Sequence, residues 1–312
     1  MTAPPVREAS ASPAIHTQDL AKRYGRTTAL RALTMTVGRG EVFGFLGPNG
    51  AGKTTAVKLL LGLARPTSGE AWILGAPLGD LATRGRVGYL PELFRYQPWL
   101  RAREVLALHC ALARIPRERR RGEIDEALRT VGLADRADDR VGTFSKGMQQ
   151  RLGLGVALLG TPDLVLLDEP TSALDPVGRR DVREIIAGLR SRGVTVFLNS
   201  HLLTEVERVC DRVAIVDKGV VVAEGRVDDI GAGAGVRVHV TDLADADRDA
   251  LRRFGPVEAN GEWLRVRGVN DGAVPELVAE IVRRGGRVHA VHPERATLED
   301  RFLALLSEEK PS

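Results

Sequence analysis

The stretch Gly47-Pro48-Asn49-Gly50-Ala51-Gly52-Lys53-Thr54-Thr55 determines the most about how this sequence folds. It stands between an apolar run, Val42 to Leu46, and a run of helical character, Ala56 to Leu63. A strand, a glycine-rich loop with Lys followed by Thr, and a helix, in that order, predict a phosphate-binding loop, or P-loop. A glycine-rich turn that merely ends a strand is the alternative, but it does not require Gly, Gly, Lys and Thr at this spacing.

The residue types in this loop suit the binding of a nucleoside triphosphate. Glycine lets the backbone bend so that successive N–H groups point at phosphate oxygens, and the positive end of the following helix adds to the attraction. Lys53 supplies a positive charge for the β- and γ-phosphates, and the hydroxyl of Thr54 can bind Mg²⁺. The expected nucleotide-binding residues of the loop are Gly47, Pro48, Asn49, Gly50, Ala51, Gly52, Lys53, Thr54 and Thr55.

Two carboxylates follow a second apolar run. Leu164 to Leu167 is followed directly by Asp168 and Glu169. Ligands of open α/β sheets bind at the carboxyl ends of the strands, so we expect Asp168 to bind the Mg²⁺ that Thr54 also contacts. Glu169 is then placed to orient and polarise the water that attacks the γ-phosphate. An acid-rich helix start is the alternative, which Pro170 and the upstream P-loop disfavour.

His201 is a third candidate for chemistry. It follows the apolar run Val194 to Leu198, so it can reach the γ-phosphate from the end of a neighbouring strand. Considered alone, His201 would be interpreted as an ordinary loop histidine, and only the presence of the other motifs favours a functional role for it. The expected catalytic residues are therefore Glu169, His201 and Lys53.

The wider sequence predicts a layered α/β domain over residues 15–225. Short apolar runs, of which Val213 to Val216 is the last, alternate with helical segments at 104–114 and 176–192. Nearly continuous apolar runs of this length are typical of buried parallel strands. The residue composition changes after Gly225. The stretch Gly231 to Gly235 has the sequence Gly-Ala-Gly-Ala-Gly, which predicts a flexible linker.

Residues 226–312 have the periodicities of a second, small α+β domain. Val236, Val238 and Val240 alternate with polar residues, which indicates a half-buried strand. A helix is expected around 274–282, and Thr297 with Asp300 resembles a capping box that opens a helix through Leu306. No phosphate loop, paired carboxylates or metal cluster appears in this segment, so the sequence predicts no site there.

Composition excludes several classes of protein. The longest run without a charged residue has 12 residues, Gly193 to Thr204, whereas a membrane-spanning helix needs about 20 apolar residues. Residues 1–14 are rich in Pro, Ala and Ser and lack the apolar segment of a secretory signal, so we expect a disordered tail on a cytoplasmic protein. The net charge of +4 comes from 39 Arg and 6 Lys interleaved with 41 acids, which favours a solvated surface over a nucleic-acid site.

These motifs, in this order, make residues 15–225 resemble the ATP-binding subunit of ATP-binding-cassette (ABC) transporters. The resemblance implies a P-loop ATPase domain of α/β class that carries a helical subdomain and an antiparallel β part. It implies that Tyr24 stacks on adenine and that Ser145 and Gly147, in Phe144-Ser145-Lys146-Gly147-Met148, face the γ-phosphate of ATP held by the opposite subunit. It further implies that Ser172 to Asp175 is a dimer-contact loop and that His201 is a switch histidine.

Two departures from the family pattern affect the signature and the metal site. Lys146 and Met148 stand where Gly and Gln are usual, while the Ser and Gly that face the nucleotide are retained. Glu92 follows Val87 to Pro91 where the family has a glutamine that senses Mg²⁺. A glutamate has similar reach and can still offer an oxygen to Mg²⁺, although it adds a negative charge and loses an amide donor. The expected metal-binding residues are Thr54, Asp168 and Glu92.

The variant signature, Glu92 and the terminal stretch Ala296 to Phe302 resemble a branch of single-cassette subunits of bacterial exporters for drugs, antibiotics or cell-envelope molecules. The resemblance implies an ATPase at the cytoplasmic face of the membrane. It also implies that two copies of the chain bind two MgATP between them and that the pair acts on a separate membrane permease. An ABC-type ATPase for nucleic acid or ribosomes is the rival, but only 92 residues separate Lys53 from Ser145, too few for a long coiled coil. A P-loop GTPase or kinase leaves residues 144–151 and His201 without a role.

Overall fold

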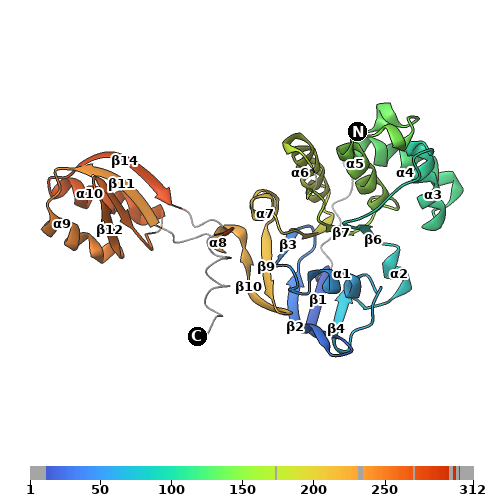
Figure 1. Cartoon of the computed structure of the whole chain (residues 1–312), viewed down its shortest axis with the longest axis horizontal. Coiled ribbons are helices and arrows are strands. Elements are labelled where there is room, and N and C mark those ends of the chain that lie inside the picture. The colour runs from blue at the N-terminus through green and yellow to red at the C-terminus, as the bar shows by residue number, and fades with distance from the viewer. Residues whose placement is uncertain are drawn as a thin grey trace. The chain divides into compact units, whose positions relative to one another are not determined.

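The computed structural model describes residues 12–172, 174–230, 235–269, 271–294, 298, 299 and 302. The chain divides into two compact units, Met1–Gly225 and Arg226–Ser312 (Figure 1). Each unit has a hydrophobic core of its own. The expected Gly/Ala linker lies at 231–235, of which only Gly235 is among the described residues.

A large mixed sheet forms the centre of the first unit. Its strand order over the described residues is β5-β4-β1-β2-β10-β9-β3-β8-β7-β6. β3, β6, β7, β8 and β9 pair in parallel, whereas β1, β2, β4 and β5 pair antiparallel. The strands are β1 (Ile15–Tyr24), β2 (Thr27–Val37), β3 (Val42–Leu46), β4 (Ser68–Ile73), β5 (Ala76–Pro77), β6 (Val87–Leu90), β7 (Leu164–Asp168), β8 (Thr195–Asn199), β9 (Arg212–Asp217) and β10 (Val220–Arg226).

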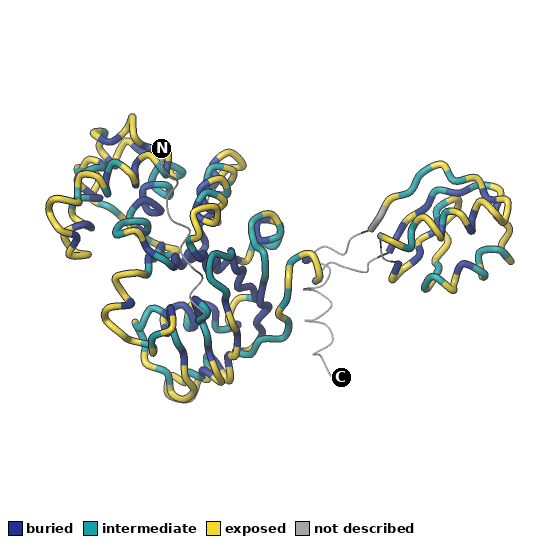
Figure 2. The backbone as a smooth tube through the Cα atoms, turned by 180° about the vertical axis from the view of Figure 1, so that it is seen from behind, coloured by how far each residue is buried: buried dark blue, intermediate teal, exposed yellow. Residues whose placement is uncertain are grey.

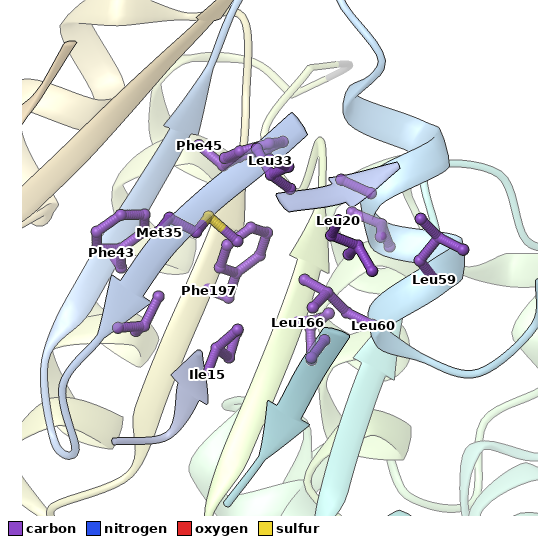
Figure 3. Packing of buried hydrophobic residues seen from close by; sticks show 14 of the residues in the cluster. Ile15, Leu20, Leu33, Met35, Phe43, Phe45, Leu59, Leu60, Leu166 and Phe197 are labelled. Atoms are coloured by element: carbon purple, nitrogen blue, oxygen red, sulfur yellow. The ribbon is translucent and has the colours of Figure 1, made fainter. Parts of the chain in front are cut away.

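The apolar runs of the sequence are the parallel strands of this sheet. Every residue of β3, β7 and β8 is buried, which explains why these strands are continuously apolar instead of alternating (Figure 2). The ring of Phe197 lies 6.1 Å from that of Phe43 and 5.2 Å from that of Phe45, centroid to centroid, so β3 and β8 are joined by aromatic packing as well as backbone pairing (Figure 3). The resulting core holds the carboxyl ends of β3, β7 and β8 in fixed positions.

Helices surround the sheet, and three of them form a separate helical layer. The buried side chains of Leu106, Leu128 and Leu152 belong to α3, α4 and α5, in agreement with the predicted helical subdomain. The helices of the unit are α1 (Lys53–Leu60), α2 (Leu81–Arg84), α3 (Ala102–Leu112), α4 (Arg117–Thr130), α5 (Lys146–Ala157), α6 (Pro176–Ser191) and α7 (Leu203–Val209), with 3₁₀ turns at Ala134–Arg136 and Val141–Thr143. None of the helices in the described residues combines the length and apolar character needed to cross a bilayer.

The predicted disordered tail, residues 1–14, includes Ala14, which belongs to the folded part of the chain. Ala14 is fully buried, its N–H donates to the carbonyl of Val37 at 2.8 Å, and its own carbonyl accepts from the N–H of Leu74 at 2.8 Å. These two bonds extend the pairing of β1 with its neighbours by one residue. Residues 1–11 lie outside the described residues.

The second unit is a four-stranded antiparallel sheet with helices against it. The strand order is β12-β13-β11-β14, and Val236, Val238 and Val240 of β11 point into the core with Leu277 and Ile281 of α10. The predicted strand and helix are thereby confirmed, whereas most of the predicted helix from Thr297 to Leu306 lies outside the described residues. The elements are α8 (Val227–Ile230), β11 (Gly235–Thr241), α9 (Asp245–Ala250), β12 (Val257–Asn260), β13 (Trp263–Val266), α10 (Val274–Arg283) and β14 (Arg287–Glu294), with 3₁₀ turns at Leu251–Phe254 and Asp271–Ala273.

Candidate active site

The glycine-rich loop connects the end of β3 to the start of α1. The helix begins at Lys53, three residues earlier than the apolar periodicity indicates, and Gly52 precedes it with a left-handed φ of 100°. A Cβ at Gly52 would collide with the carbonyl oxygen of Ala29, and one at Gly47 with the carbonyl oxygen of Val216. Both positions therefore require glycine. The loop places the amino end of α1 next to the carboxyl end of β3, which is the usual geometry for binding phosphate.

Lys53 lies inside this loop. Its Nζ donates to the carbonyl oxygen of Gly47 at 2.6 Å and to that of Pro48 at 3.2 Å. Burial lowers the pKa of Lys53, and the nearby charges of Glu169, Asp168 and Glu92 oppose that shift. The ammonium group is therefore held among carbonyl oxygens and within electrostatic reach of three acids, where a phosphate would be an additional partner for it.

Asp168 ends β7 and is tied to the neighbouring strand. Asn199, the last residue of β8, donates from Nδ2 to Asp168 Oδ1 at 2.5 Å. Burial raises the pKa of Asp168, while the bond from Asn199 acts in the opposite direction. The carboxylate is thus oriented by a neutral donor, which leaves its second oxygen for a cation.

Glu169 has an unusual backbone. Its φ of 51° is left-handed, a conformation that side-chain-bearing residues adopt at a cost of about 1–3 kcal/mol and that concentrates at functional sites. Its N–H donates to the carbonyl of Asn199 at 2.9 Å, so the turn is fixed by the adjacent strand. The residue is only 8% exposed, and burial raises the pKa of its carboxyl group.

His201 and Glu169 meet at this edge. Nδ1 of His201 lies 2.8 Å from Oε2 of Glu169, and the imidazole is about half exposed. The contact with His201 lowers the pKa of the Glu169 carboxyl group, against the larger effect of burial, and Oε2 is a buried acceptor with no other hydrogen-bond partner among the described residues. A buried carboxylate oxygen in this state is suited to accept a hydrogen bond from a substrate or a water.

The three residues expected to bind a metal differ in their surroundings. The negative charge of Glu92 raises the pKa of the Asp168 carboxyl group and acts on Lys53, so the exposed side chain of Glu92 is within electrostatic range of both groups. Thr54 is exposed on the first turn of α1, directly after Lys53. Asn199 Oδ1 is buried and receives no hydrogen bond among the described residues. This collection of hard oxygen donors fits Mg²⁺, which prefers carboxylate and hydroxyl oxygens.

The signature residues belong to the helical layer. Ser145 is the N-cap of α5, where its Oγ accepts from the N–H of Met148 at 3.2 Å, and its side chain is exposed. A Cβ at Gly147 would approach only Ser145 Oγ, so the space beside the helix start is open. In the described residues Ser145 makes no hydrogen bond to the P-loop of its own chain.

Asp175 and Tyr24 are two further residues predicted to bind nucleotide. Asp175 is the N-cap of α6, accepts from the N–H of Gly178 at 2.7 Å and is exposed; Ala173 of the same loop is not described. Tyr24 ends β1 with 47% of its surface exposed, and Lys22 Nζ lies 4.8 Å from its ring centroid. Direct contacts and electrostatic effects therefore link Lys53, Glu92, Asp168, Glu169 and His201, whereas Tyr24, Ser145 and Asp175 are exposed and Gly147 is half-buried.

Asn199 is the site residue that sequence reasoning missed. It fixes Asp168 through its side chain and Glu169 through its carbonyl. A signal was present, because Asn199 is a polar residue at the carboxyl end of an apolar run and lies two residues before His201.

Comparisons with known proteins agree with this geometry. A family model described as ABC transporter matches residues 30–172. The chain is 36% identical over 301 residues to the Nod factor export ATP-binding protein I of Burkholderia orbicola (strain AU 1054), covering 94% of this chain and 96% of that protein. It is 41% identical over 213 residues to the bacitracin transport ATP-binding protein BcrA of Bacillus licheniformis, covering 67% and 69%.

A solved structure shares the fold. It is a dimeric ATP-binding cassette in a post-hydrolysis state with bound ADP and phosphate, with a TM-score of 0.60 and 26% identity over 68% of this chain and 98% of that one. From its motifs, its architecture and these relatives, the chain belongs to the ABC transporter family, as an ATP-binding subunit.

Proposed function

We propose that this chain hydrolyses ATP to ADP and phosphate in order to power export across a membrane, with Glu169 as the residue that activates water. ATP-binding subunits of the family are ATPases, and the finer assignment rests on one observation. The Glu169 carboxylate is buried, is held by a left-handed turn and has an oxygen that contacts the half-exposed imidazole of His201 and has no other hydrogen-bond partner among the described residues. A solvated, structural glutamate requires none of these features.

The residues of the site divide the work of hydrolysis. The P-loop amides and Lys53 bind the phosphate chain and stabilise the charge that develops on the γ-phosphate oxygens. Glu169 accepts a hydrogen bond from the attacking water and takes its proton as the oxygen–phosphorus bond forms. His201, beside Glu169, orients that carboxylate and the γ-phosphate. The mechanism relies on positioning and electrostatics and needs no covalent enzyme intermediate.

The oxygen donors next to the P-loop are suited to a magnesium ion. Thr54, Asp168 and Glu92 would hold it, with Asn199 orienting Asp168. Mg²⁺ would neutralise negative charge on the β- and γ-phosphates. Glu92 contributes a full negative charge to this group, so we propose that it offers an oxygen and tunes the coupling to the membrane partner.

The complete site requires two copies of the chain. Ser145 and Asp175 are exposed, Gly147 is half-buried, and Ser145 makes no hydrogen bond to the P-loop of its own chain in the described residues. The solved relative with ADP and phosphate is a dimer. In the proposed dimer, the P-loop and Tyr24 of one subunit bind ATP, and the signature residues of the other close over its γ-phosphate.

Mixing two inactive variants tests this arrangement. Lys53→Ala removes the P-loop charge, and Ser145→Arg blocks the signature, so each homodimer has two defective sites. A mixed dimer has one intact site, and the mixture should recover part of the wild-type ATPase rate. Lys53→Ala mixed with the double variant Lys53→Ala/Ser145→Arg has no intact site and is the matched control. Equal rates in the two mixtures would show that the site does not cross between subunits.

The transported molecule and the membrane partner are proposed from the relatives. Their names describe export of Nod factor and transport of bacitracin, which supports an exporter of antibiotics, drugs or cell-envelope molecules for this chain. The chain would act at the cytoplasmic face of the membrane on a separate integral permease. Affinity purification of the tagged chain from detergent-solubilised membranes tests this. Recovery of an integral membrane protein supports the assignment, and recovery of nucleic acid or ribosomes alone contradicts it.

A further inference from the structure

Helix α6 runs from the expected dimer-contact loop to the neighbourhood of the switch histidine. Its N-cap is Asp175, and it packs against α7, which begins two residues after His201. Any displacement of α7 relative to α6 therefore moves the segment that carries the imidazole. The contacts between these two helices decide how firmly His201 is held against Glu169.

A buried ion pair joins the two helices. Nη1 of Arg183, in the middle of α6, lies 3.0 Å from Oε1 and 2.8 Å from Oε2 of Glu205, in the first turn of α7. Glu205 is only 5% exposed, and Arg183 is mostly buried. Both contacts come from the single nitrogen Nη1, so one charged donor, shared by both carboxylate oxygens, holds the two side chains at short range.

The switch segment is anchored at further points. The Oγ of Ser200 accepts from the N–H of Leu202 at 3.1 Å, which shapes the turn around His201. Arg190 of α6 forms an ion pair with Asp211, just beyond the end of α7, and Asp211 Oδ2 accepts from the N–H of Val42 at 2.9 Å. The Arg183–Glu205 pair is at the first turn of α7, whereas the Arg190–Asp211 pair lies beyond the last residue of α7. Arg183 is therefore the arginine of α6 that holds the end of α7 nearest to His201.

Stability alone does not explain an ion pair at this position. Apolar side chains of similar volume often replace buried ion pairs at no cost in stability, because desolvation of the charges offsets their attraction. A short charge-assisted contact from Nη1 to both carboxylate oxygens does fix the distance between the two helices at this point, which apolar packing specifies less tightly. That property is useful where a residue four positions earlier in the chain, His201, must hold its distance to Glu169.

We infer that Arg183 is a positioning residue for ATP hydrolysis: its ion pair with Glu205 holds α7 against α6 and so keeps His201 beside Glu169. This inference rests on the proposed roles of His201 and Glu169. The same ion pair connects the expected dimer-contact loop to the residues proposed for hydrolysis. Asp175 is the N-cap of α6, and Arg183 of that same helix contacts α7, which follows His201.

Steady-state ATPase assays and histidine NMR of the full chain test the inference. The variants are Arg183→Met, which leaves Glu205 unpaired, and Arg183→Met/Glu205→Gln, which removes both charges and guards against misfolding. Arg180→Met is the matched control, because Arg180 lies on the same helix but pairs with Glu184 at the surface. The ring signal of His201, one of six histidines, is identified by its loss in His201→Ala.

Both Arg183 variants should lower kcat by about tenfold, a modest part of what a misplacement of about 1 Å can cost, with KM for ATP changed by less than about twofold. Both should shift the ring signal of His201, and Arg180→Met should change neither quantity. A double variant with wild-type kcat, or a lowered kcat with an unmoved His201 signal, overturns the inference. If His201→Ala itself turns over at the wild-type rate, the proposed role of His201 fails instead, whatever the Arg183 variants do.

Discussion

The side chain of Asn199 donates a 2.5 Å hydrogen bond to Asp168, and its carbonyl accepts from the backbone of Glu169 at 2.9 Å. One residue at the end of β8 thereby fixes both acids at the end of β7. The parallel register, in which Asp168 lies opposite Asn199, makes this possible. The acid that we propose binds metal and the acid that we propose activates water are consequently positioned by a strand neighbour that itself needs no contact with nucleotide.

We predict that Asn199→Ala weakens magnesium binding. Without the amide donor, the pKa of Asp168 should rise further and its carboxylate should lose its orientation. Loss of such a supporting partner typically costs about 10–100-fold in metal affinity. The Mg²⁺ concentration for half-maximal ATPase activity should rise accordingly, and Asn260→Ala, an exposed site on β12, should not change it. An unaltered Mg²⁺ requirement would remove Asn199 from this role.

We predict that Lys53→Ala loses nucleotide binding itself. A positive charge beside the phosphates stabilises the bound ground state together with the transition state, so its removal lowers affinity as well as rate. Hydrogen bonds to charged groups contribute about 1.5–3 kcal/mol, which corresponds to roughly 10–100-fold in affinity. Equilibrium titration with a fluorescent ATP analogue measures the effect. Wild-type affinity in this variant would contradict the assignment of Lys53.

We predict a pH-dependent gain in stability for Glu169→Gln. Burial raises the pKa of Glu169 in the folded state, so the ionised carboxylate disfavours folding fully above that pKa. The penalty declines as pH falls below it and is lost below the usual glutamate pKa of the unfolded chain. At pH 8 the variant without nucleotide should therefore melt about 2–4 °C higher, as expected for about 1 kcal/mol. At mildly acidic pH, near the usual glutamate value, the difference should disappear.

Thermal melts across this pH range check that prediction. Glu70→Gln, at an exposed position of β4, is the control for removal of one negative charge and should show no such pH-dependent gain. A Glu169→Gln protein that is less stable than wild type at pH 8 would mean that the His201 and Lys53 contacts outweigh burial.

Sequence reasoning located the elements correctly where their pattern is local. The strands β3 and β7, the loop before α1 and the position of the two acids after the apolar run of β7 follow from continuous apolar runs and the residues directly after them, because parallel strands bury both faces. It failed where the role depends on a neighbour distant in sequence. Asn199 acts on Asp168 across the sheet, Arg183 reaches Glu205 on another helix, and the pairing of Ala14 requires Val37.

We predict that a chain cut after Gly225 remains folded and binds MgATP. All the nucleotide-site residues precede the cut, and each compact unit has its own core. The truncated chain should melt cooperatively, and saturating MgATP should raise its melting temperature as it does for the full chain. The alternative is that Leu298 and Phe302 complete the core of the cassette. An insoluble truncated chain, or one that MgATP does not stabilise, would support that alternative.

Glu169→Gln provides the most direct test of the account as a whole. Measured side by side, the turnover number and the dissociation constant of ATP separate activation of water from binding of nucleotide. We predict that the variant binds MgATP with near-normal affinity, accumulates as a dimer, and hydrolyses ATP at least about 100-fold more slowly, the usual lower range for loss of a general base. A variant that keeps most of the wild-type turnover would contradict the central claim that Glu169 activates the attacking water.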